Sequence, residues 1–222
     1  MEKGQEAKDR SIVSYTLSQR IYIVFKYIFD IFFSALMMIP LFVLCIIVKA
    51  VNLFKKDDGS LFYRQKRIGK DGKPFKIIKF RTMSPNAERE LQELLKDDNN
   101  KNEWEEYHKL KNDPRITPFG LFLRKSSLDE FPQFINVLKG DMALIGPRPL
   151  VPGELKMHDG LPIYEAIRPG ITGWWACNGR SVLTYKERLE YEYYYVRNIS
   201  LRLDIKVFFK TIACIISKAG AQ

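Results

Sequence analysis

The stretch IFFSALMMIPLFVLCIIV, residues Ile31–Val48, decides the architecture of this chain. It carries no charge over about eighteen residues, the length at which a membrane-associated helix becomes the leading interpretation. A helix buried in a soluble core is the alternative, but this run has no polar face to present to water. Pro40 lies in the middle of the run, where it removes one helical hydrogen bond and favours a kink. We therefore expect a bent membrane helix.

Positive charge borders this run at both ends. The basic residues before it are Lys8, Arg10, Arg20 and Lys26, and those after it are Lys49, Lys55, Lys56, Arg64, Lys66 and Arg67. A straight crossing would place one basic flank outside the cell, whereas two half-helices bent at Pro40 keep both at the cytoplasmic face with its anionic lipids. We expect this re-entrant hairpin, and a single-span anchor remains the alternative.

The composition restricts the classes of protein to which the chain can belong. Its 222 residues, of which 46% are hydrophobic, can bury one good core, and this excludes a disordered polymer. The net charge of +10 requires an anionic partner, such as nucleic acid, a membrane surface or a phosphorylated substrate. The three cysteines are far apart in the sequence, which predicts a reduced compartment without a disulfide framework. His108 and His158 are expected at the surface, not in a zinc site or a Ser/His/Asp triad.

A β-hairpin is expected directly after the apolar run. Its strands are Leu61–Gln65 and Pro74–Arg81, which are rich in aromatic and β-branched residues, and Gly69–Gly72 between them is a turn signal. The polar side of this hairpin is basic. It is either a solvated lysine face or, as we favour next to a membrane run, a docking surface for phosphates and lipid head groups.

The remaining pattern is mostly helical. Ser84-Pro85 is typical of an N-cap followed by proline at the first helical position, and a second short helix is expected at 103–111. A further helix is expected over Gln133–Lys139. The segment Thr184–Lys218 predicts one or two helices with a break at Asn198–Ser200 and a basic, amphipathic second half. These elements together predict an α+β protein that is mostly helical, with interfacial amphipathic helices.

The segment Arg124–Gln133 is the candidate reaction centre, because Asp129 and Glu130 place adjacent carboxylates after a basic, hydroxylated turn. At a helix start, the positive end of the dipole would keep the aspartate ionised and attract phosphate. The alternative is structural, since Ser127 and Glu130 also fit the capping-box template. Pro132 complicates that alternative, because it lacks the donor that a regular helix needs there.

Arginine-bearing loops favour the phosphate-binding interpretation. In Gly146–Pro149, two prolines hold Arg148 in a stiff, extended backbone, and its guanidinium suits bidentate phosphate binding. The loop 168–180 combines three glycines with two tryptophans and has arginines at both ends, suited to gripping a nucleotide or lining the membrane interface. An incidental arginine on a surface loop remains the alternative for Arg148.

Several ordered motifs carry a family resemblance. They are Phe29-Asp30, Arg64–Gly69, Lys79–Met83, Leu123–Glu130, Pro132-Gln133, Asn136–Met142, Gly146–Pro149, Pro169–Trp174 and Asn178–Arg180. On these residues the chain, from about Ile21 to Ser217, closely resembles the bacterial sugar transferases, which are monotopic phosphoglycosyl transferases. It departs from the family pattern in two places: Ile39-Pro40 replaces a Ser-Pro pair, and Trp175–Cys177 replaces a more usual Ala-Gln-Val or Trp-Gln-Val.

The resemblance implies a reaction and a setting. Members of this family move a sugar 1-phosphate from a UDP-sugar to polyprenyl (undecaprenyl) phosphate, release UMP and require Mg²⁺. It implies a polar lead-in at 1–20, a re-entrant membrane helix at 21–50, and a catalytic domain at 51–222 on the cytoplasmic face of the bacterial inner membrane. The expected partners are the UDP-sugar, polyprenyl phosphate and anionic membrane lipids, with a homodimer left open and no nucleic acid.

Within this resemblance the residues receive roles. As a hypothesis, Asp129 attacks the sugar-bearing phosphate to form an acyl-phosphate intermediate, while Glu130 positions groups or manages a proton. Asp129 would also bind Mg²⁺ together with the pyrophosphate. The expected phosphate- and substrate-binding residues are Arg124, Arg148, Arg168, Arg180, Lys79 and Arg81. Two rival functions are a ternary-complex transferase without a covalent intermediate and a non-enzymatic, basic membrane scaffold; no nucleic-acid-reading motif is present in the sequence.

Overall fold

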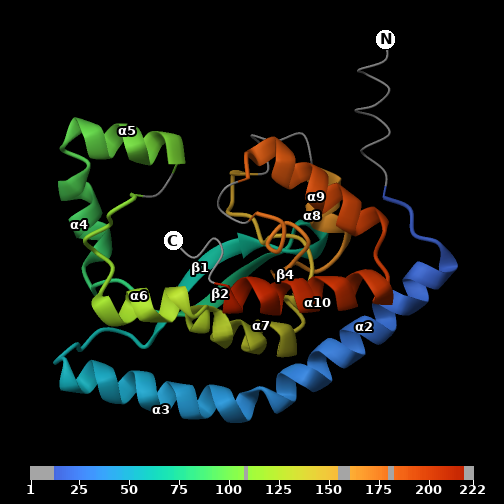
Figure 1. Cartoon of the computed structure of the whole chain (residues 1–222), viewed down its shortest axis with the longest axis horizontal. Coiled ribbons are helices and arrows are strands. Elements are labelled where there is room, and N and C mark those ends of the chain that lie inside the picture. Colours follow the sequence, from blue (N-terminus) through green and yellow to red (C-terminus); the bar gives the residue numbers. More distant parts are fainter. Residues whose placement is uncertain (1–12, 108–109, 155–160, 180–182, 218–222) are drawn as a thin grey trace.

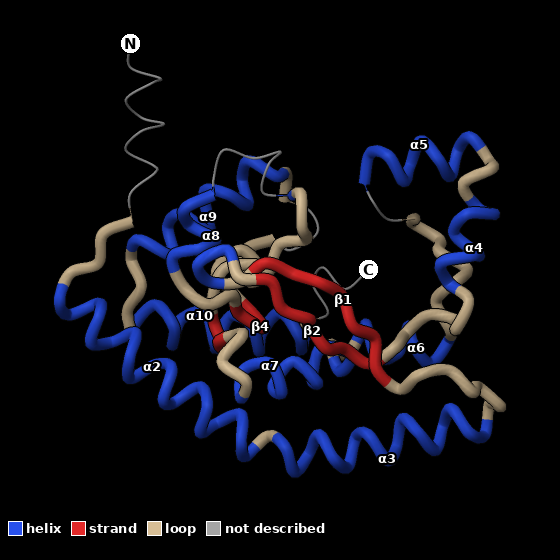
Figure 2. The backbone as a smooth tube through the Cα atoms, turned by 180° about the vertical axis from the view of Figure 1, so that it is seen from behind, coloured by secondary structure: helices blue, strands red, loops and turns tan. Residues whose placement is uncertain are grey.

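The computed structural model describes residues 13–107, 110–154, 161–179 and 183–217, and shows the expected α+β fold. Two long helices, α2 (Leu17–Leu36) and α3 (Met38–Phe54), form an arm along one side of the molecule (Figure 1). The other elements are stacked on the inner side of this arm, as the view from behind also shows (Figure 2).

The arm is bent where the sequence predicts a kink. The two helices meet at Met37 with an angle of 44° between them. Pro40 is the third residue of α3, and in the first turn of a helix a missing N–H leaves no hydrogen bond unmade. The break therefore falls just before the proline. Among the described residues no single helix is long and apolar enough to cross a membrane, and α2 and α3 meet these requirements only as a bent pair.

The β-hairpin is confirmed. Strands β1 (Phe62–Ile68) and β2 (Pro74–Phe80) pair antiparallel, with Phe62 opposite Phe80. The short 3₁₀ helix η1 (Lys70–Gly72) closes the hairpin, and Asp71 has a left-handed φ of 57° in this turn. Phe80 is buried together with Leu41 and Val48 of α3 and Leu123, so the hairpin is packed onto the arm.

The helices that follow differ from the prediction in their boundaries. Helix α4 (Ala87–Leu94) begins after Asn86, and Ser84 donates from its hydroxyl to Glu90 Oε2 at 2.6 Å. The predicted Ser84-Pro85 cap was therefore wrong. Helix α5 (Asp98–Tyr107) begins five residues before the predicted 103, because the Asp97 carboxylate accepts from the N–H groups of Asn99 and Asn100. The polar run that was expected to separate two helices starts the second one.

A short parallel strand pair, β3 (Ala143–Ile145) and β4 (Gly170–Thr172), was not predicted. Three residues are too few to show a period-two pattern. The pairing requires glycine, because a Cβ on Gly170 would lie 2.1 Å from the backbone nitrogen of Gly146. The connecting elements of this half are α6 (Pro118–Lys125), η2 (Leu128–Gln133), α7 (Phe134–Leu138) and α8 (Leu161–Ala166).

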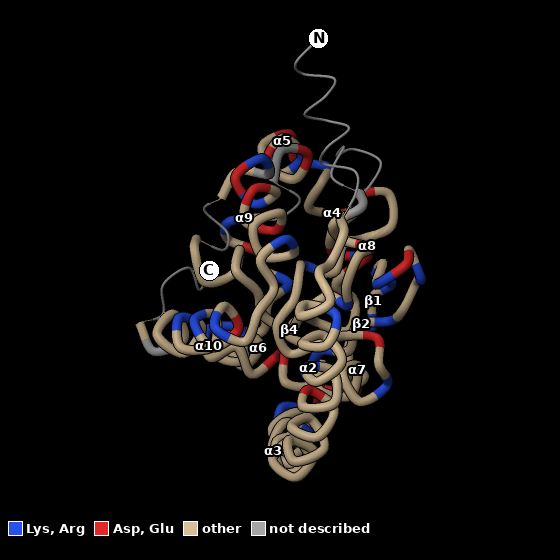
Figure 3. Tube along the Cα trace, turned by 90° about the vertical axis from the view of Figure 1, so that its right-hand side faces the viewer, with Lys and Arg blue, Asp and Glu red and all other residues tan. Residues whose placement is uncertain are grey.

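The C-terminal helices are confirmed with their break. They are α9 (Tyr185–Arg197) and α10 (Leu201–Ile216), and the Ser200 hydroxyl caps α10 by accepting from Leu203 N. Helix α10 keeps large apolar side chains exposed on one face, as α2 and α3 do. The exposed apolar side chains of these helices include Phe25, Phe29, Phe32, Ile39, Phe42, Ile46, Phe54, Ile205, Phe208, Phe209 and Ile212. Figure 3 shows α3 with very few charged residues, while Lys and Arg gather on the hairpin and on α10.

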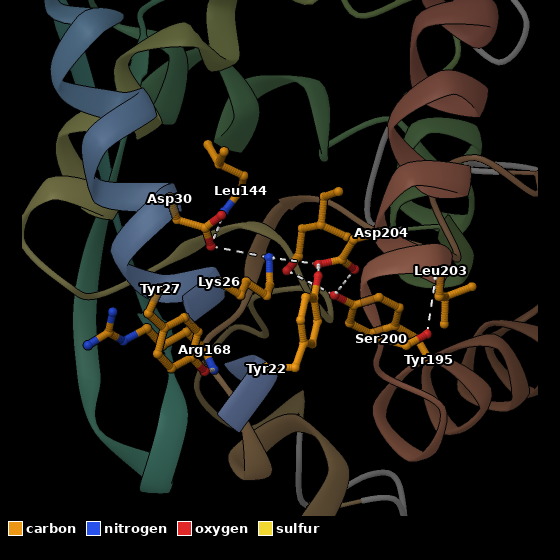
Figure 4. Close-up of polar contacts among 11 residues, drawn as sticks. Tyr22, Lys26, Tyr27, Asp30, Leu144, Arg168, Tyr195, Ser200, Leu203 and Asp204 are labelled. Atoms are coloured by element: carbon orange, nitrogen blue, oxygen red, sulfur yellow. Dashed lines mark hydrogen bonds and ion pairs between the residues drawn. The ribbon is translucent and has the colours of Figure 1, made fainter. Parts of the chain in front are cut away.

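A buried ionic network joins α2 to the rest of the fold (Figure 4). Lys26 Nζ lies 3.2 Å from Asp30 Oδ2 and 3.1 Å from Asp204 Oδ2, with each of these side chains 8% exposed or less. The hydroxyls of Tyr22 and Tyr195 both donate to Asp204 at 2.7 Å. One cation thus holds a carboxylate of α2 and one of α10, and the tyrosines satisfy the second carboxylate.

The Lys26→Met variant should lose stability, because it leaves two carboxylates buried without their cation. Breaking such a buried pair costs about 3–5 kcal/mol. A thermal or denaturant melt of the detergent-solubilised chain measures the loss. Arg20→Met, in the exposed first turn of the same helix, is the matched control and should melt close to the wild type. Equal melting of the Lys26 variant and the control would contradict a stabilising role for the network.

Candidate active site

The two adjacent carboxylates lie on η2, immediately after a strained turn. Ser127 has a left-handed φ of 56° and makes no side-chain capping bond to any residue that the structure describes. The capping-box alternative for Glu130 was therefore wrong. The segment is a 3₁₀ helix instead of the first turn of a regular helix, and Pro132 lies inside it. This arrangement tolerates Pro132, which has no backbone N–H to donate. It also turns the two carboxylates toward β2.

Glu130 is paired with the hairpin. Lys79 Nζ donates to Glu130 Oε1 at 2.8 Å, and the two side chains are about a third exposed. Lys79 is the last residue but one of β2, so the strand register presents it to η2 while Phe80 turns into the core. Lys79, which is predicted from the sequence to bind phosphate or substrate, thus lies beside the carboxylate pair.

Asp129 is the more buried of the two, at 8% exposure. Burial raises the pKa of its carboxyl to about 6; Lys79 and Arg124 oppose the rise, and the charge of Glu130 adds to it. A carboxylate in this position is ionised at neutral pH but poorly solvated. The ionised carboxylate of Asp129 therefore lowers the stability of the fold. Carboxylates with such a raised pKa are common in active sites.

Arg124 faces Asp129 from the end of α6. Its Nε donates to Thr82 Oγ1 at 2.9 Å, and burial lowers the pKa of the guanidinium while Asp129 opposes this. Helix α6 lies close to the segment after β2, since a Cβ on Gly120 would overlap the carbonyl oxygen of Thr82 at 1.9 Å. Thr82 was not predicted as a site residue, although it lies inside the Lys79–Met83 motif.

Arg148 lies in a second basic group. Its guanidinium is 5.7 Å from the ring centroid of Trp175, and Nη2 is 3.9 Å from Glu154 Oε1. Its backbone N–H donates to Glu192 Oε1 at 2.8 Å. The loop after β3 is therefore anchored to α9, and Arg148 is partly exposed.

The other predicted arginines have different settings. Arg81 Nη2 donates to both oxygens of Asp57 at 2.8 Å, and its other donors contact the carbonyls of Ser60 and Met83. Arg168 lies over the ring of Tyr27 at 4.2 Å, beside α2. In the structure Arg81 thus links the end of the hairpin to the segment after α3, and Arg168 contacts α2. Arg180 lies outside the described residues.

A small pocket opens beside Glu130. It has a volume of about 100 Å³. Its lining consists of Ser127, Glu130, Phe131, Phe134, Ile171, Thr172, Thr211 and Ile215. The hydroxyls of Thr172 and Thr211 lie 2.9 Å apart, and they link β4 to α10 in the wall of the pocket. The pocket is mixed in character, with a carboxylate at one side and apolar side chains from α7 and α10 at the other.

The residues present are compatible with one magnesium ion held jointly with substrate. Within the described ranges there is no group of three or more His, Cys, Asp or Glu side chains that could enclose a metal. Mg²⁺ commonly keeps several waters and binds one or two carboxylates together with substrate phosphates. Asp129 fits this pattern, because it is an anionic oxygen ligand next to cationic groups that suit phosphate.

A family comparison decides the assignment. Residues 21–218 match the model of the family described as bacterial sugar transferase. This chain belongs to that family. The family that the motifs predicted is thus confirmed, and the matched range includes Asp129, Glu130 and each cationic residue placed above.

Relatives of this sugar transferase include the UDP-galactose-lipid carrier transferase of Erwinia amylovora, 43% identical over 177 residues, and the undecaprenyl-phosphate galactose phosphotransferase of Salmonella typhimurium, 46% identical over 168 residues. The alignments cover 79% and 75% of this chain but 37% and 35% of those proteins, so the chain spans about a third of their length. The exopolysaccharide production protein ExoY of Sinorhizobium fredii is 42% identical over 195 residues, which are 87% of this chain and 86% of that protein.

The Asp129→Asn variant should be more stable than the wild type at pH 8. The folded-state pKa is raised from 3.8 to about 6, so the ionised carboxylate destabilises the fold above pH 6 by about 3 kcal/mol. The asparagine lacks this penalty. The gain should shrink as the pH falls from 6 to 4, where the wild-type carboxyl is protonated in the folded state and is becoming protonated in the unfolded state. Melts at pH 4 and pH 8 measure it, and a gain that is the same at both would contradict the assignment.

Proposed function

We propose that this chain is a phosphoglycosyl transferase that moves a sugar 1-phosphate from a UDP-sugar to polyprenyl phosphate and releases UMP. The observation that carries the proposal is the buried carboxylate of Asp129, which faces Arg124 and the Lys79–Glu130 ion pair on a 3₁₀ turn of the family motif. The names of the relatives from Erwinia and Salmonella supply the substrate classes, a UDP-sugar donor and an undecaprenyl-phosphate acceptor.

The reaction proceeds in two displacements at one phosphorus atom. An oxygen of Asp129 attacks the phosphorus that bears the sugar, and the P–O bond to the bridging oxygen breaks, so UMP leaves with the bonding electron pair. An aspartyl phosphosugar remains on the protein. An oxygen of polyprenyl phosphate then attacks the same phosphorus, and the P–O bond to Asp129 breaks to restore the carboxylate. The product is a polyprenyl diphosphate sugar.

The surrounding side chains suit both displacements. Arg124 and Lys79 place positive charge beside the phosphoryl oxygens, where negative charge is highest in the transition state. Burial leaves Asp129 with few hydrogen bonds to give up when it attacks. Glu130, through its ion pair with Lys79, fixes the ammonium group near the reacting phosphorus. We retain Arg148 as a phosphate-binding residue and assign Arg81 and Arg168 to the scaffold, while Arg180 stays a prediction.

A bound Mg²⁺ would add charge neutralisation at the diphosphate. Asp129 is the protein ligand that we assign to it, with the remaining positions taken by phosphate oxygens and water. The cationic side chains Arg124 and Lys79 hold the phosphates from the protein side. They keep the sugar-bearing phosphate in place while the carboxylate engages it.

A membrane setting follows from the acceptor. We propose that α2 and α3 enter the cytoplasmic leaflet as a re-entrant pair, with the apolar face of α10 lying on the lipid surface and the basic hairpin near anionic head groups. The exposed apolar side chains of these helices support this placement. The catalytic part would then lie at the cytoplasmic face of the bacterial inner membrane, where a soluble donor and a lipid acceptor can both reach Asp129.

A labelling experiment separates the covalent route from a ternary-complex route. The full chain incubated with UDP-sugar labelled in the sugar-bearing phosphate, without lipid, should form a labelled protein adduct and release UMP in a single turnover. Asp129→Asn should do neither. Asp58→Asn, an exposed aspartate after α3, is the control and should behave as the wild type. Absence of both adduct and lipid-independent UMP release from the wild type would count against the covalent intermediate.

The rate should depend on the ionisation of Asp129. Because only the carboxylate can attack, kcat/KM should rise about tenfold per pH unit below the pKa of about 6 and level off above it. UMP release measured from pH 5 to pH 8 checks this. A Lys79→Met variant, which loses an opposing positive charge, should shift the midpoint to higher pH. A profile that is flat between pH 5 and 7 would contradict Asp129 as the nucleophile.

A further inference from the structure

A second cationic group gathers around Trp175. Arg148 comes from the loop after β3, Arg188 from α9 and Arg67 from β1. The guanidinium carbons of Arg148 and Arg188 lie 5.7 Å and 5.5 Å from the Trp175 ring centroid. Two arginines from separate elements therefore lie over one tryptophan, and Arg148, Arg188, Arg67 and Trp175 are all partly exposed.

Arg67 is fixed to the same loop as Arg148. Its Nη1 donates to the carbonyl oxygen of Pro149 at 3.0 Å, and its Nη2 donates to Gln65 Oε1 at 2.6 Å. Burial lowers the pKa of this guanidinium, and the charge of Arg148 lowers it further, while Glu154, then Tyr63 and Glu130, act in the opposite direction. Arg67 thus lies within electrostatic reach of Arg148, Glu154 and Glu130.

The charge of Arg148 acts on both of the other arginines. Burial, followed by the charge of Arg148, also lowers the pKa of Arg188. The nearby carboxylates are Glu154 and Glu192. Burial raises the pKa of Glu192 to about 8, so most of this carboxyl is protonated at neutral pH and does not offset the arginines. A bound anion reduces the repulsion between neighbouring guanidinium groups, and arginine is the side chain best suited to phosphate oxygens.

Glu192 is built into the base of this site. It is 0% exposed, Oε1 accepts from the backbone N–H of Arg148 at 2.8 Å, and Oε2 has no hydrogen-bond partner among the described residues. It cannot contact a ligand, but it fixes the backbone of the arginine that can. Glu192 accepts a hydrogen bond from the backbone of Arg148, and the charges of Arg148 and Arg188 affect its pKa. It is therefore suited to a positioning role.

The location of the group indicates which phosphate it receives. Helices α8 and α9 lie on the side of the β1–β2 hairpin that faces away from α3 (Figures 1 and 2). A lipid phosphate remains near the helices with exposed apolar faces. A soluble nucleotide that approaches from the opposite side would meet these arginines, with its two phosphates extending toward Asp129.

We propose that Arg67, Arg188 and Arg148 form a subsite for the diphosphate of the nucleotide donor, and that Glu192 is the positioning residue of Arg148 in this subsite. This inference rests on the proposed function, because it takes a nucleoside diphosphate sugar as the donor. It assigns substrate contacts to Arg67 and Arg188, which lie outside the Asp129 turn, and it accounts for a buried glutamate that the displacements do not use.

Binding of UDP to the full chain in detergent tests the subsite without requiring turnover. Arg188→Gln and Arg67→Gln should each weaken UDP binding about tenfold to a hundredfold, the range for a lost charge-assisted hydrogen bond. Dodecyl phosphate, which mimics the lipid head group, should bind these variants within twofold of the wild type. Arg197→Gln, which alters an arginine of the same helix that lies over Tyr193, should leave both affinities unchanged.

The role of Glu192 can be tested by the pH dependence of UDP binding. Bound diphosphate should favour its protonated form, because the phosphates reduce the stabilisation that Arg148 and Arg188 give to the ionised carboxyl. Glu154 and Tyr164 are the other titratable groups beside these arginines. UDP affinity should therefore fall as the pH rises from 7 to 9, and Glu192→Gln should bind UDP with little change over this range. A structural role alone would not produce this difference.

The results distinguish this proposal from the proposed function. Unchanged UDP affinity in both arginine variants, with melting temperatures like that of the wild type, would overturn the subsite, and so would weakened binding of dodecyl phosphate alone. If one arginine variant fails to fold, the other, on a different element, still decides. Asp129→Asn should abolish turnover but keep UDP binding within about threefold. An active Asp129→Asn variant would overturn the proposed function and leave the UDP data on the subsite intact.

Discussion

The contact of Lys26 with Asp30 and Asp204 is the constraint on which the remaining structure depends. Removing three charged groups from water is costly, and only the close geometry and the two tyrosine hydroxyls offset this cost. Asp30 also accepts from the backbone N–H of Leu144 at 3.2 Å, so the same network fixes β3. An arm whose other side chains are mainly apolar is thereby joined to the protein by directional bonds. Apolar contacts alone are not directional and would not fix the position of the arm along the rest of the protein.

This attachment positions the chemistry. Helix α3 contributes Leu41 and Val48 to the cluster that contains Phe80 and Leu123, and this cluster lies beneath the turn that carries Asp129. The hairpin supplies Lys79 and α6 supplies Arg124, and both elements contact η2. The buried aspartate is thus surrounded by elements that are each anchored elsewhere. Its desolvation is stable because the surrounding packing prevents the turn from relaxing toward water.

Much of the fold and part of the site could be predicted from the sequence. The hairpin, the kink near Pro40 and the break at Asn198–Ser200 follow from local patterns that the structure retains. The β3–β4 pair could not be predicted, because its evidence is a close approach of two glycines far apart in the chain. The role of Arg81 is also non-local, since only the folded chain places Asp57 beside it. The sequence alone could not distinguish a capping Glu130 from one paired with Lys79.

The hairpin turn has a consequence for how this protein can change in evolution. Side chains alternate between the two faces of a strand, so a shift of one residue in the β1–β2 register would replace Lys79 with a hydrophobic neighbour at η2. That register is held by η1, where Asp71 and Gly72 both have positive φ and Gly69 N donates to the Lys73 carbonyl at 2.9 Å. Loops at a surface usually tolerate insertions, but the length of this turn sets the register of β1 and β2. A single added residue there would leave the hairpin paired and remove the ammonium group from the carboxylates.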